Sequence, residues 1–240
     1  KRLGNVNYLS DDQVSQYVHH LPTYVSHFMD IDHPSDERAI RTEMVNIIRR
    51  ACNQGLMIST YGTVSVRWNE NDFLITPSNI ARWDIVPSDI VQIKNGMAEA
   101  GKVPSRSVAL HQRIYQLNPH INSIISTQSV NLMAHAVSGT RFDVRTIPES
   151  WIFLQDVPSI PFGLIYNDVD SVAKMFNKNR VILVENDSVF ITGDKLLNTF
   201  DYLEVAEFSA NSLVMASSIG QLQPIGDEEI DELRVAFNVK

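Results

Sequence analysis

Along most of the chain, short apolar segments typical of β-strands alternate with longer segments whose apolar residues repeat at helical spacing. Strands are expected at Thr63–Trp68, Phe73–Thr76, Ile90–Ile93, Ser123–Thr127, Val181–Val184 and Ser188–Thr192. Helices are expected around the stripe from Ile40 to Ala51 and at Val108–Leu117, Val130–Val137, Val169–Asn177, Lys195–Ser217 and Glu228–Phe237. The amino-acid composition does not change along this series of strand and helix segments. The pattern therefore predicts one α/β domain.

The first part of the chain reads differently. Ser10-Asp-Asp-Gln13 forms a capping box, which predicts a helix that starts after Ser10 and runs towards Met29. Pro34 breaks this helix, and Ser35 is placed to act as the N-cap of the next one. Gly55 suits the C-terminal cap of that second helix.

Composition narrows the classes of partner. The 240 residues carry a formal net charge of −8, which argues against nucleic acid or an anionic membrane as a partner. No apolar run reaches membrane-spanning length. Cys52 is the only cysteine, so an internal disulfide is excluded. We therefore expect a cytoplasmic protein that does not bind membranes.

Several motifs occur in the order found in the class II aldolase/adducin family, whose members include L-fuculose-phosphate aldolases and ribulose-phosphate 4-epimerases. The segment Gly55–Arg67 resembles the family's Gly-x-x-x-Gly-Thr-Ser-Gly-Asn-Val-Ser-x-Arg, and Phe73–Asn79 resembles Phe-Leu-Ile-Thr-Pro-Ser-Gly. Further similar blocks are Val86–Val91, Ser105–His111, Ile147–Glu149, Asp156–Pro158 and Val181–Asp187, the last standing where the family has Asn-His-Gly. The resemblance implies a three-layer α/β/α sandwich with a mixed central sheet over residues 35–240. Residues 1–34 would be an N-terminal helical extension.

The resemblance also implies a site for a catalytic Zn²⁺, but with changed ligands. In the family, the strand matching Ser123–Thr127 ends in His-x-His, because residues i and i+2 of a strand share a face and both imidazoles reach one ion. Those two positions are Ser126 and Gln128 here, and the third histidine is assigned to Asn186. The family's general acid/base glutamate falls on Ser107. Neutral hydroxyl and amide groups bind Zn²⁺ poorly, so we expect vestigial ligand positions and no bound metal.

The alternative to lost metal ligands is that these motifs are misaligned and that the ligands lie elsewhere in the chain. The seven histidines are His19, His20, His27, His33, His111, His120 and His135, and none forms His-x-His. His111 matches a histidine of the family, although its place beside a helical apolar stripe also suits a structural role.

The turns that hold the substrate phosphate in the family are partly retained. Such turns form concavities lined by backbone N–H groups, which bind anions. The candidate residues for binding a small phosphorylated or carboxylate ligand are Thr60, Gly62, Thr63, Thr76, Ser78, Asn79, Ser105 and Arg106. Thr63, Asn79 and Arg106 depart from the family pattern. Arg106 could supply a bidentate contact to an anion, or could be a solvated surface arginine.

The sequence is compatible with three functions. The first is a domain without metal-dependent activity that serves as an oligomeric assembly, regulatory or small-anion-binding protein. Its homo-oligomer would be a tetramer by resemblance. The second is an enzyme with metal-independent chemistry that uses Arg106, His111 or Glu149. The third is an active sugar-phosphate aldolase or epimerase, a carbon–carbon lyase, with unusual metal ligands.

Overall fold

The computed structural model describes residues 8–19, 26–29 and 33–239 and confirms the α/β class. Within these residues, one mixed sheet has the strand order β1-β5-β4-β3-β2-β6-β9-β8-β7. The strands are β1 (His27–Phe28), β2 (Thr63–Arg67), β3 (Phe73–Ile75), β4 (Val91–Lys94), β5 (Met97–Glu99), β6 (Ser123–Thr127), β7 (Ser159–Ile160), β8 (Val181–Val184) and β9 (Ser188–Gly193). Neighbouring strands are antiparallel except at the two edges, where β1 pairs with β5 and β7 with β8 in parallel.

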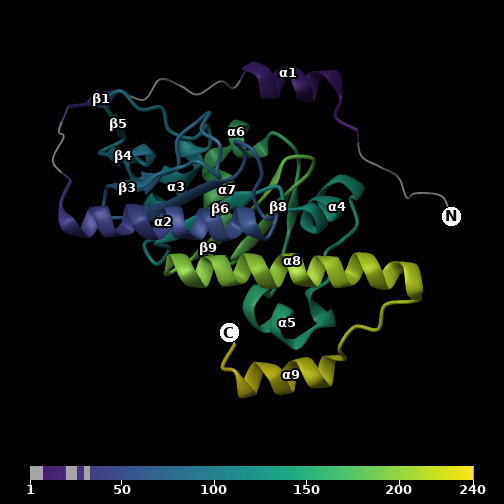
Figure 1. Ribbon diagram of the computed structural model, residues 1–240. Helices are drawn as coiled ribbons and strands as arrows, with labels where there is room; N and C mark the ends of the chain where they lie inside the picture. The colour runs from purple at the N-terminus through teal and green to yellow at the C-terminus, as the bar shows by residue number, and fades with distance from the viewer. Residues whose placement is uncertain (1–7, 20–25, 30–32, 240) are drawn as a thin grey trace.

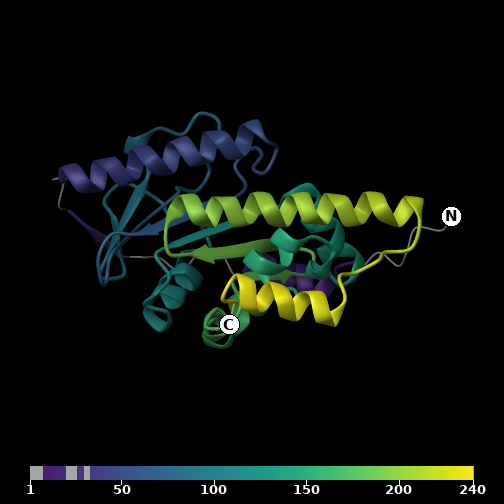
Figure 2. The same cartoon turned by 90° about the horizontal axis from the view of Figure 1, so that it is seen from below.

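Helices cover both faces of the sheet. The described helices are α1 (Asp11–His19), α2 (Ser35–Asn53), α3 (Val108–Leu117), α4 (Val130–Ser138), α5 (Pro148–Leu154), α6 (Leu164–Asn167), α7 (Val169–Met175), α8 (Leu196–Ile219) and α9 (Asp227–Ala236), with short 3-10 helices η1 (Pro87–Asp89) and η2 (Val144–Thr146). The long helices α2 and α8 run alongside each other in two views (Figures 1 and 2). No described helix combines the length and apolar character needed to span a bilayer.

Two apolar clusters, one on each face of the sheet, explain the three layers. Strand β8 shows the cause, because its side chains alternate between faces at a period of two. Val181 and Leu183 pack into the cluster beneath α2, α4, α5 and α8, whereas Ile182 and Val184 join the cluster beneath α3, α6 and α7. All four side chains are buried, as expected for a strand covered on both faces.

The N-terminal segment follows the prediction only in part. The capping box is present: the Ser10 backbone N–H donates to Gln13 Oε1 at 2.8 Å, and the Gln13 N–H donates to Ser10 Oγ at 3.3 Å. The helix predicted to reach Met29 is wrong at its far end, because His27–Phe28 forms β1 and pairs with β5. Residues 20–25 lie outside the described residues. The division of the chain at residue 34 remains a prediction.

Other departures lie at element ends and in short elements. Pro34 occupies the N-cap position of α2 and Ser35 is its first helical residue, so the predicted Ser35 cap is wrong. Gly55 does take the left-handed conformation expected of it after α2, with φ = 71°. The elements that were not predicted are β1, β5, β7, α5, α6 and the 3-10 helices η1 and η2. They contain two to seven residues, too few to establish a period.

Candidate functional site

A cleft lies where β2, β6 and β9 meet the loops that precede α3 and follow β7. The strand register builds its floor: Thr63 of β2 pairs with Ser126 of β6, and Ser126 pairs with Phe190 of β9. Paired residues in adjacent strands project to the same face, so these side chains form one row. The cleft is lined by Tyr61, Gly62, Thr63, Ser105, Arg106, Ser107, Ser126, Thr127, Gln128, Ile165, Tyr166, Asp187, Ser188 and Phe190.

Three hydroxyl groups form a compact cluster on one wall of this cleft. Thr63 Oγ1 and Ser105 Oγ are 2.6 Å apart, Ser105 and Ser107 Oγ are 3.3 Å apart, and Ser107 Oγ lies 3.5 Å from Thr63 Oγ1. Thr63 and Ser105 are buried, and Ser107 is half-buried. Hydroxyls both donate and accept hydrogen bonds, so the cluster can turn its protons towards the oxygens of an anion.

The loop around Gly62 is held in place by close packing and by a buried arginine. Gly62 has φ = 94°, and a Cβ at this position would lie 2.9 Å from Met57 Cγ, so glycine is required. The Arg82 guanidinium donates to the carbonyl oxygens of Gly62 at 2.8 Å and Ile80 at 2.7 Å. Burial lowers the pKa of Arg82 to about 10, which leaves it charged at neutral pH. These contacts fix one rim of the cleft.

The predicted anion-binding residues are only partly brought together. Gly62, Thr63, Ser105 and Arg106 line the cleft, but Thr60, Thr76, Ser78 and Asn79 are not among its lining residues. Ser78 Oγ instead donates to the Pro104 carbonyl oxygen at 2.7 Å, and the buried Thr76 Oγ1 accepts from the Val64 N–H at 3.3 Å. Asn79 adopts the left-handed conformation, with φ = 60°, that the family's glycine would take. The hydroxyls of this second turn therefore make hydrogen bonds within the fold rather than lining the cleft.

The four predicted metal and acid/base positions also meet only in part. Ser107, Ser126 and Gln128 line the cleft, but Asn186 does not; Asp187 takes its place. Asn186 is at the centre of the tight turn between β8 and β9, with φ = 56°, and its N–H donates to Ala136 of α4 at 3.3 Å. Asp187, the next residue in this turn, lines the cleft instead. The assignment of Asn186 to the third histidine of the family remains a prediction.

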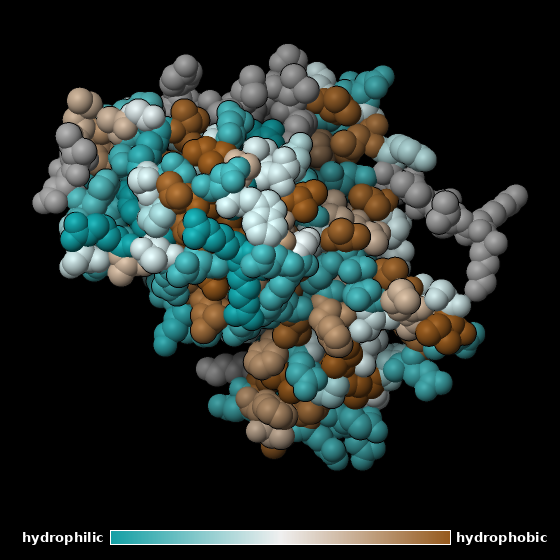
Figure 3. Space-filling model, viewed as in Figure 1, coloured by the Kyte–Doolittle hydropathy of each residue, from teal (hydrophilic) through white to brown (hydrophobic). Residues whose placement is uncertain are grey.

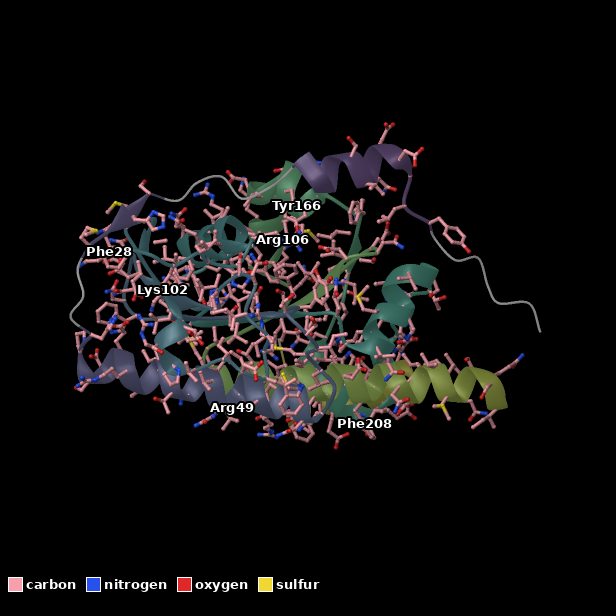
Figure 4. All side chains as sticks on the ribbon, turned by 45° about the horizontal axis from the view of Figure 1, so that its top comes forward. Phe28, Arg49, Lys102, Arg106, Tyr166 and Phe208 are labelled. Atoms are coloured by element: carbon pink, nitrogen blue, oxygen red, sulfur yellow. The ribbon has the colours of Figure 1, made fainter. Side chains whose placement is uncertain are left out.

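Asp187 is the carboxylate among the residues that line the cleft, and the residue is 9% exposed. Burial raises its pKa, while a hydrogen bond from Ser188 Oγ at 3.2 Å and the charge of Arg106 act in the opposite direction. Gln128 Nε2 donates to the Asp187 carbonyl oxygen at 2.7 Å. Figure 4 labels Arg106, before α3, and Tyr166, on α6, close together in its view, and both line the cleft. Sequence patterns gave no indication of Tyr166, because α6 is only four residues long.

His111 lies behind the cleft and does not line it. Its ring is fully buried, Nδ1 is 2.7 Å from Ser65 Oγ, and Ser65 Oγ is 2.7 Å from the Tyr115 hydroxyl. Burial lowers the pKa of His111 to about 3, so the ring is neutral at physiological pH. Glu149, another candidate of the sequence analysis, is also absent from the lining. The geometry favours a structural role for His111.

The donor groups of the cleft do not fit a zinc ion. Zinc sites in proteins use imidazole, thiolate and carboxylate ligands, three or four at a time. The cleft offers one carboxylate, Asp187, with the Gln128 amide and the Ser107 and Ser126 hydroxyls. Across the described parts of the chain, no group of three His, Cys, Asp or Glu side chains is placed to hold a metal.

Comparison with known proteins identifies the family. The sequence-family model of the class II aldolase and adducin N-terminal domain matches residues 42–214 of this chain. The chain belongs to the class II aldolase and adducin family. It is 29% identical to the 5-methylthioribulose-1-phosphate/5-deoxyribulose-1-phosphate aldolase of Escherichia coli O45:K1 over 147 residues, 60% of this chain and 68% of that protein. It is 24% identical to the methylthioribulose-1-phosphate dehydratase of Microcystis aeruginosa, over 75% of this chain and 97% of the relative.

Solved structures agree with this membership. The fold matches an L-fuculose 1-phosphate aldolase with a TM-score of 0.72 and 25% identity, covering 86% of this chain and 98% of that one. It also matches the Escherichia coli protein YgbL with a TM-score of 0.76 and 21% identity, over 82% and 99% of the two chains. The family and the three-layer fold expected from the sequence are both confirmed.

Proposed function

We propose that this class II aldolase-like protein binds a small organic anion, such as a phosphorylated sugar, in the cleft and has lost zinc-dependent aldolase activity. The proposal rests mainly on the side chains that line the cleft. They include Ser107, Ser126, Gln128 and Asp187, and none of the lining residues is a histidine. Without three strong ligands, zinc would not be retained at cellular concentrations. The fold and the hydroxyl-lined wall persist, and these are suited to binding.

The relatives support a phosphorylated ligand. The names of two of them specify methylthioribulose 1-phosphate, that of a third specifies L-fuculose phosphate, and that of a fourth specifies a 3-oxo-tetronate 4-phosphate. In this chain, the hydroxyl cluster of Thr63, Ser105 and Ser107 and the exposed Arg106 line one cleft. Hydroxyls and a guanidinium together form charge-assisted hydrogen bonds with phosphate oxygens.

The test combines metal analysis with calorimetry. Purified protein should contain no stoichiometric zinc by mass spectrometry, and after treatment with a chelator it should still bind glycerol 3-phosphate. Arg106→Ala should weaken that binding by roughly 10- to 100-fold, since hydrogen bonds to charged groups contribute about 1.5–3 kcal/mol. The control Arg141→Ala removes an exposed arginine that lines a different hollow and should leave the affinity unchanged. Stoichiometric zinc, or an unchanged affinity in Arg106→Ala, contradicts the proposal.

A metal-independent lyase is the second candidate, and Asp187 is the observation that favours it. A largely buried carboxyl group with a raised pKa in a cleft is a common feature of general acids and bases. Turnover of L-fuculose 1-phosphate in the presence of chelator, abolished by Asp187→Asn, would establish this function in place of a purely binding role.

Assembly into a homo-oligomer, with a tetramer as the expected form, is also part of the proposal. Phe208, Met215 and Ile219 lie on one face of α8 and are 63%, 59% and 85% exposed. In Figure 3, apolar side chains are interspersed with polar ones on the visible surface over this region. Exposed apolar stripes of this kind commonly mark contacts between subunits. Light scattering at micromolar concentration should give a mass above that of the monomer, and Phe208→Glu should lower it. A monomeric wild type contradicts assembly but leaves ligand binding untouched.

A further inference from the structure

The cleft carries a negatively charged group, Asp187, and no metal-binding cluster of His, Cys, Asp or Glu is found among the described residues. This residue comes from the turn between β8 and β9, and it lines the cleft with only 9% of its surface exposed. An ionised carboxylate accepts hydrogen bonds and cannot donate them. Any ligand atom that approaches Asp187 must therefore be a donor, such as a hydroxyl group, or must carry positive charge.

Gln128 extends this acceptor character. Its Nε2 donates to the backbone carbonyl oxygen of Asp187 at 2.7 Å, which leaves Oε1 as the acceptor atom of the amide. Ser188 Oγ donates to Asp187 Oδ2 at 3.2 Å and helps to fix the carboxylate. The end of the cleft at β6 and β9 therefore favours hydrogen-bond donors.

The loop before α3 instead carries groups that favour a negatively charged part of a ligand. Arg106 supplies a positive charge, and the cluster of Thr63, Ser105 and Ser107 can direct towards an anion those hydroxyl protons that its internal hydrogen bonds do not use. A ligand with one anionic end and one neutral hydroxylated end matches both parts. A ligand with a second carboxylate would bring like charges together in a partly desolvated cleft, which costs free energy.

We propose that Asp187 is a specificity-determining residue, which makes the cleft select phosphorylated polyols over phosphorylated carboxylic acids. The phosphate binds at Arg106 and the hydroxyl cluster, and the polyol hydroxyls donate to Asp187 and Gln128. This inference rests on the proposed binding function and narrows it to one class of ligand. The class differs from ligands that chelate a metal through a carbonyl or carboxylate oxygen.

A matched pair of ligands tests the selection. Glycerol 3-phosphate and 3-phosphoglycerate share a three-carbon skeleton and a phosphate, but one ends in a hydroxymethyl group and the other in a carboxylate. Calorimetry on the wild-type protein in chelator should show at least about tenfold tighter binding of glycerol 3-phosphate, which corresponds to roughly 1.4 kcal/mol. Asp187→Asn should reduce this preference to within about threefold, chiefly by strengthening the binding of 3-phosphoglycerate.

Two control variants isolate the effect. Arg106→Ala should weaken the binding of both ligands and leave the ratio of their two affinities similar. Glu185→Gln neutralises a carboxylate two residues away that does not line the cleft, and it should leave both affinities unchanged. Equal binding of the two ligands by the wild type, or an unchanged preference in Asp187→Asn, overturns the selection while the binding function stands. Failure of the wild type to bind either ligand overturns both.

Discussion

At the β1 edge of the sheet, five ionisable side chains are packed into one network, whereas the cleft at the ends of β2 and β6 holds mostly neutral hydroxyl and amide groups. The network consists of His33, Glu37, Arg41, Glu99 and Lys102. Arg41 Nε donates to Glu37 Oε1 at 2.8 Å, and a terminal nitrogen of Arg41 is 2.8 Å from Glu99 Oε2. The contacts join α2 to β5.

The two regions differ in how fully their polar groups are matched. Glu99 also accepts from Lys102 at 2.6 Å, and His33 Nδ1 is 3.0 Å from Glu37. Burial raises the pKa of Glu99, but the hydrogen bonds from Lys102 and Arg41 outweigh it, so the pKa is lowered overall. In the cleft, Thr63, Ser105 and Ser107 contact chiefly one another. Matched charges hold the fold together, and hydroxyls with spare bonding capacity are available to a ligand.

The largest expected effect is the conversion of the cleft into a metal site. Ser126→His, Gln128→His and Asp187→His together should create zinc binding, because structural zinc sites contribute roughly 10–16 kcal/mol of apparent binding free energy. The matched control carries Asn186→His in place of Asp187→His. Because a retained Asp187 carboxylate could itself serve as a third zinc ligand, this control also carries Asp187→Asn, and it should then bind zinc far more weakly, since Asn186 does not line the cleft. Equilibrium dialysis with zinc compares the two, and equal affinities would contradict the assignment of Asp187.

Removal of Arg41 should have the next largest effect. Arg41→Met leaves Glu37 and Glu99 buried without their main partner, which typically costs about 3–5 kcal/mol. Urea unfolding measures the loss of free energy. Arg113→Met is the control, because the Arg113–Asp170 pair lies at the surface, and its unfolding midpoint should hardly change. A similar small change in Arg41→Met would show that the network is dispensable.

His111 predicts a pH dependence of stability. Its pKa is about 3 in the folded protein, below the value of 6.5 of an unburied histidine. The unfolded chain therefore takes up the proton first, and the stabilising contribution is complete above pH 6.5 and decreases as the pH falls towards 3. Between pH 6.5 and 4 the loss from this residue is about 3 kcal/mol, at 1.36 kcal/mol per unit. His111→Gln should lose correspondingly less stability over this window, as measured by urea unfolding at each pH. If the wild type and His111→Gln lost equal free energy of unfolding over this pH range, the contribution assigned to His111 would be contradicted.

The smallest effect on stability is expected in the cleft itself. Ser107→Ala removes a half-buried hydroxyl with long contacts and should change the free energy of unfolding by no more than about 0.5 kcal/mol. Its affinity for glycerol 3-phosphate should fall by a few-fold to about tenfold, in line with roughly 0.5–1.5 kcal/mol for one hydrogen bond. Thermal unfolding and calorimetry on the same sample separate the two readouts. Lost stability with unchanged affinity would place Ser107 in the fold rather than in the binding site.

Much of the candidate site could be anticipated because strand geometry is regular. Ser126 lies in β6 and Gln128 directly follows that strand, two residues on, and both line the cleft as the spacing predicted. Loops gave poorer predictions. Thr60 and Ser78 belong to turns with the expected sequence, yet neither lines the cleft, because turn side chains have no fixed period. Asp187 lies in the turn between β8 and β9, and its place in the cleft was not predicted, for the same reason.

The sequence by itself determined the α/β class, the family and the positions of the main strands, because apolar periodicity and ordered motifs are local properties. It also determined the absence of histidine at the expected ligand positions. Only the tertiary structure decided that Asp187 and Arg106 line one cleft, that His111 is fully buried and does not line it, and that Arg41 joins two buried glutamates. These outcomes depend on which side chains meet across distant elements, and spacing along the chain does not encode that information.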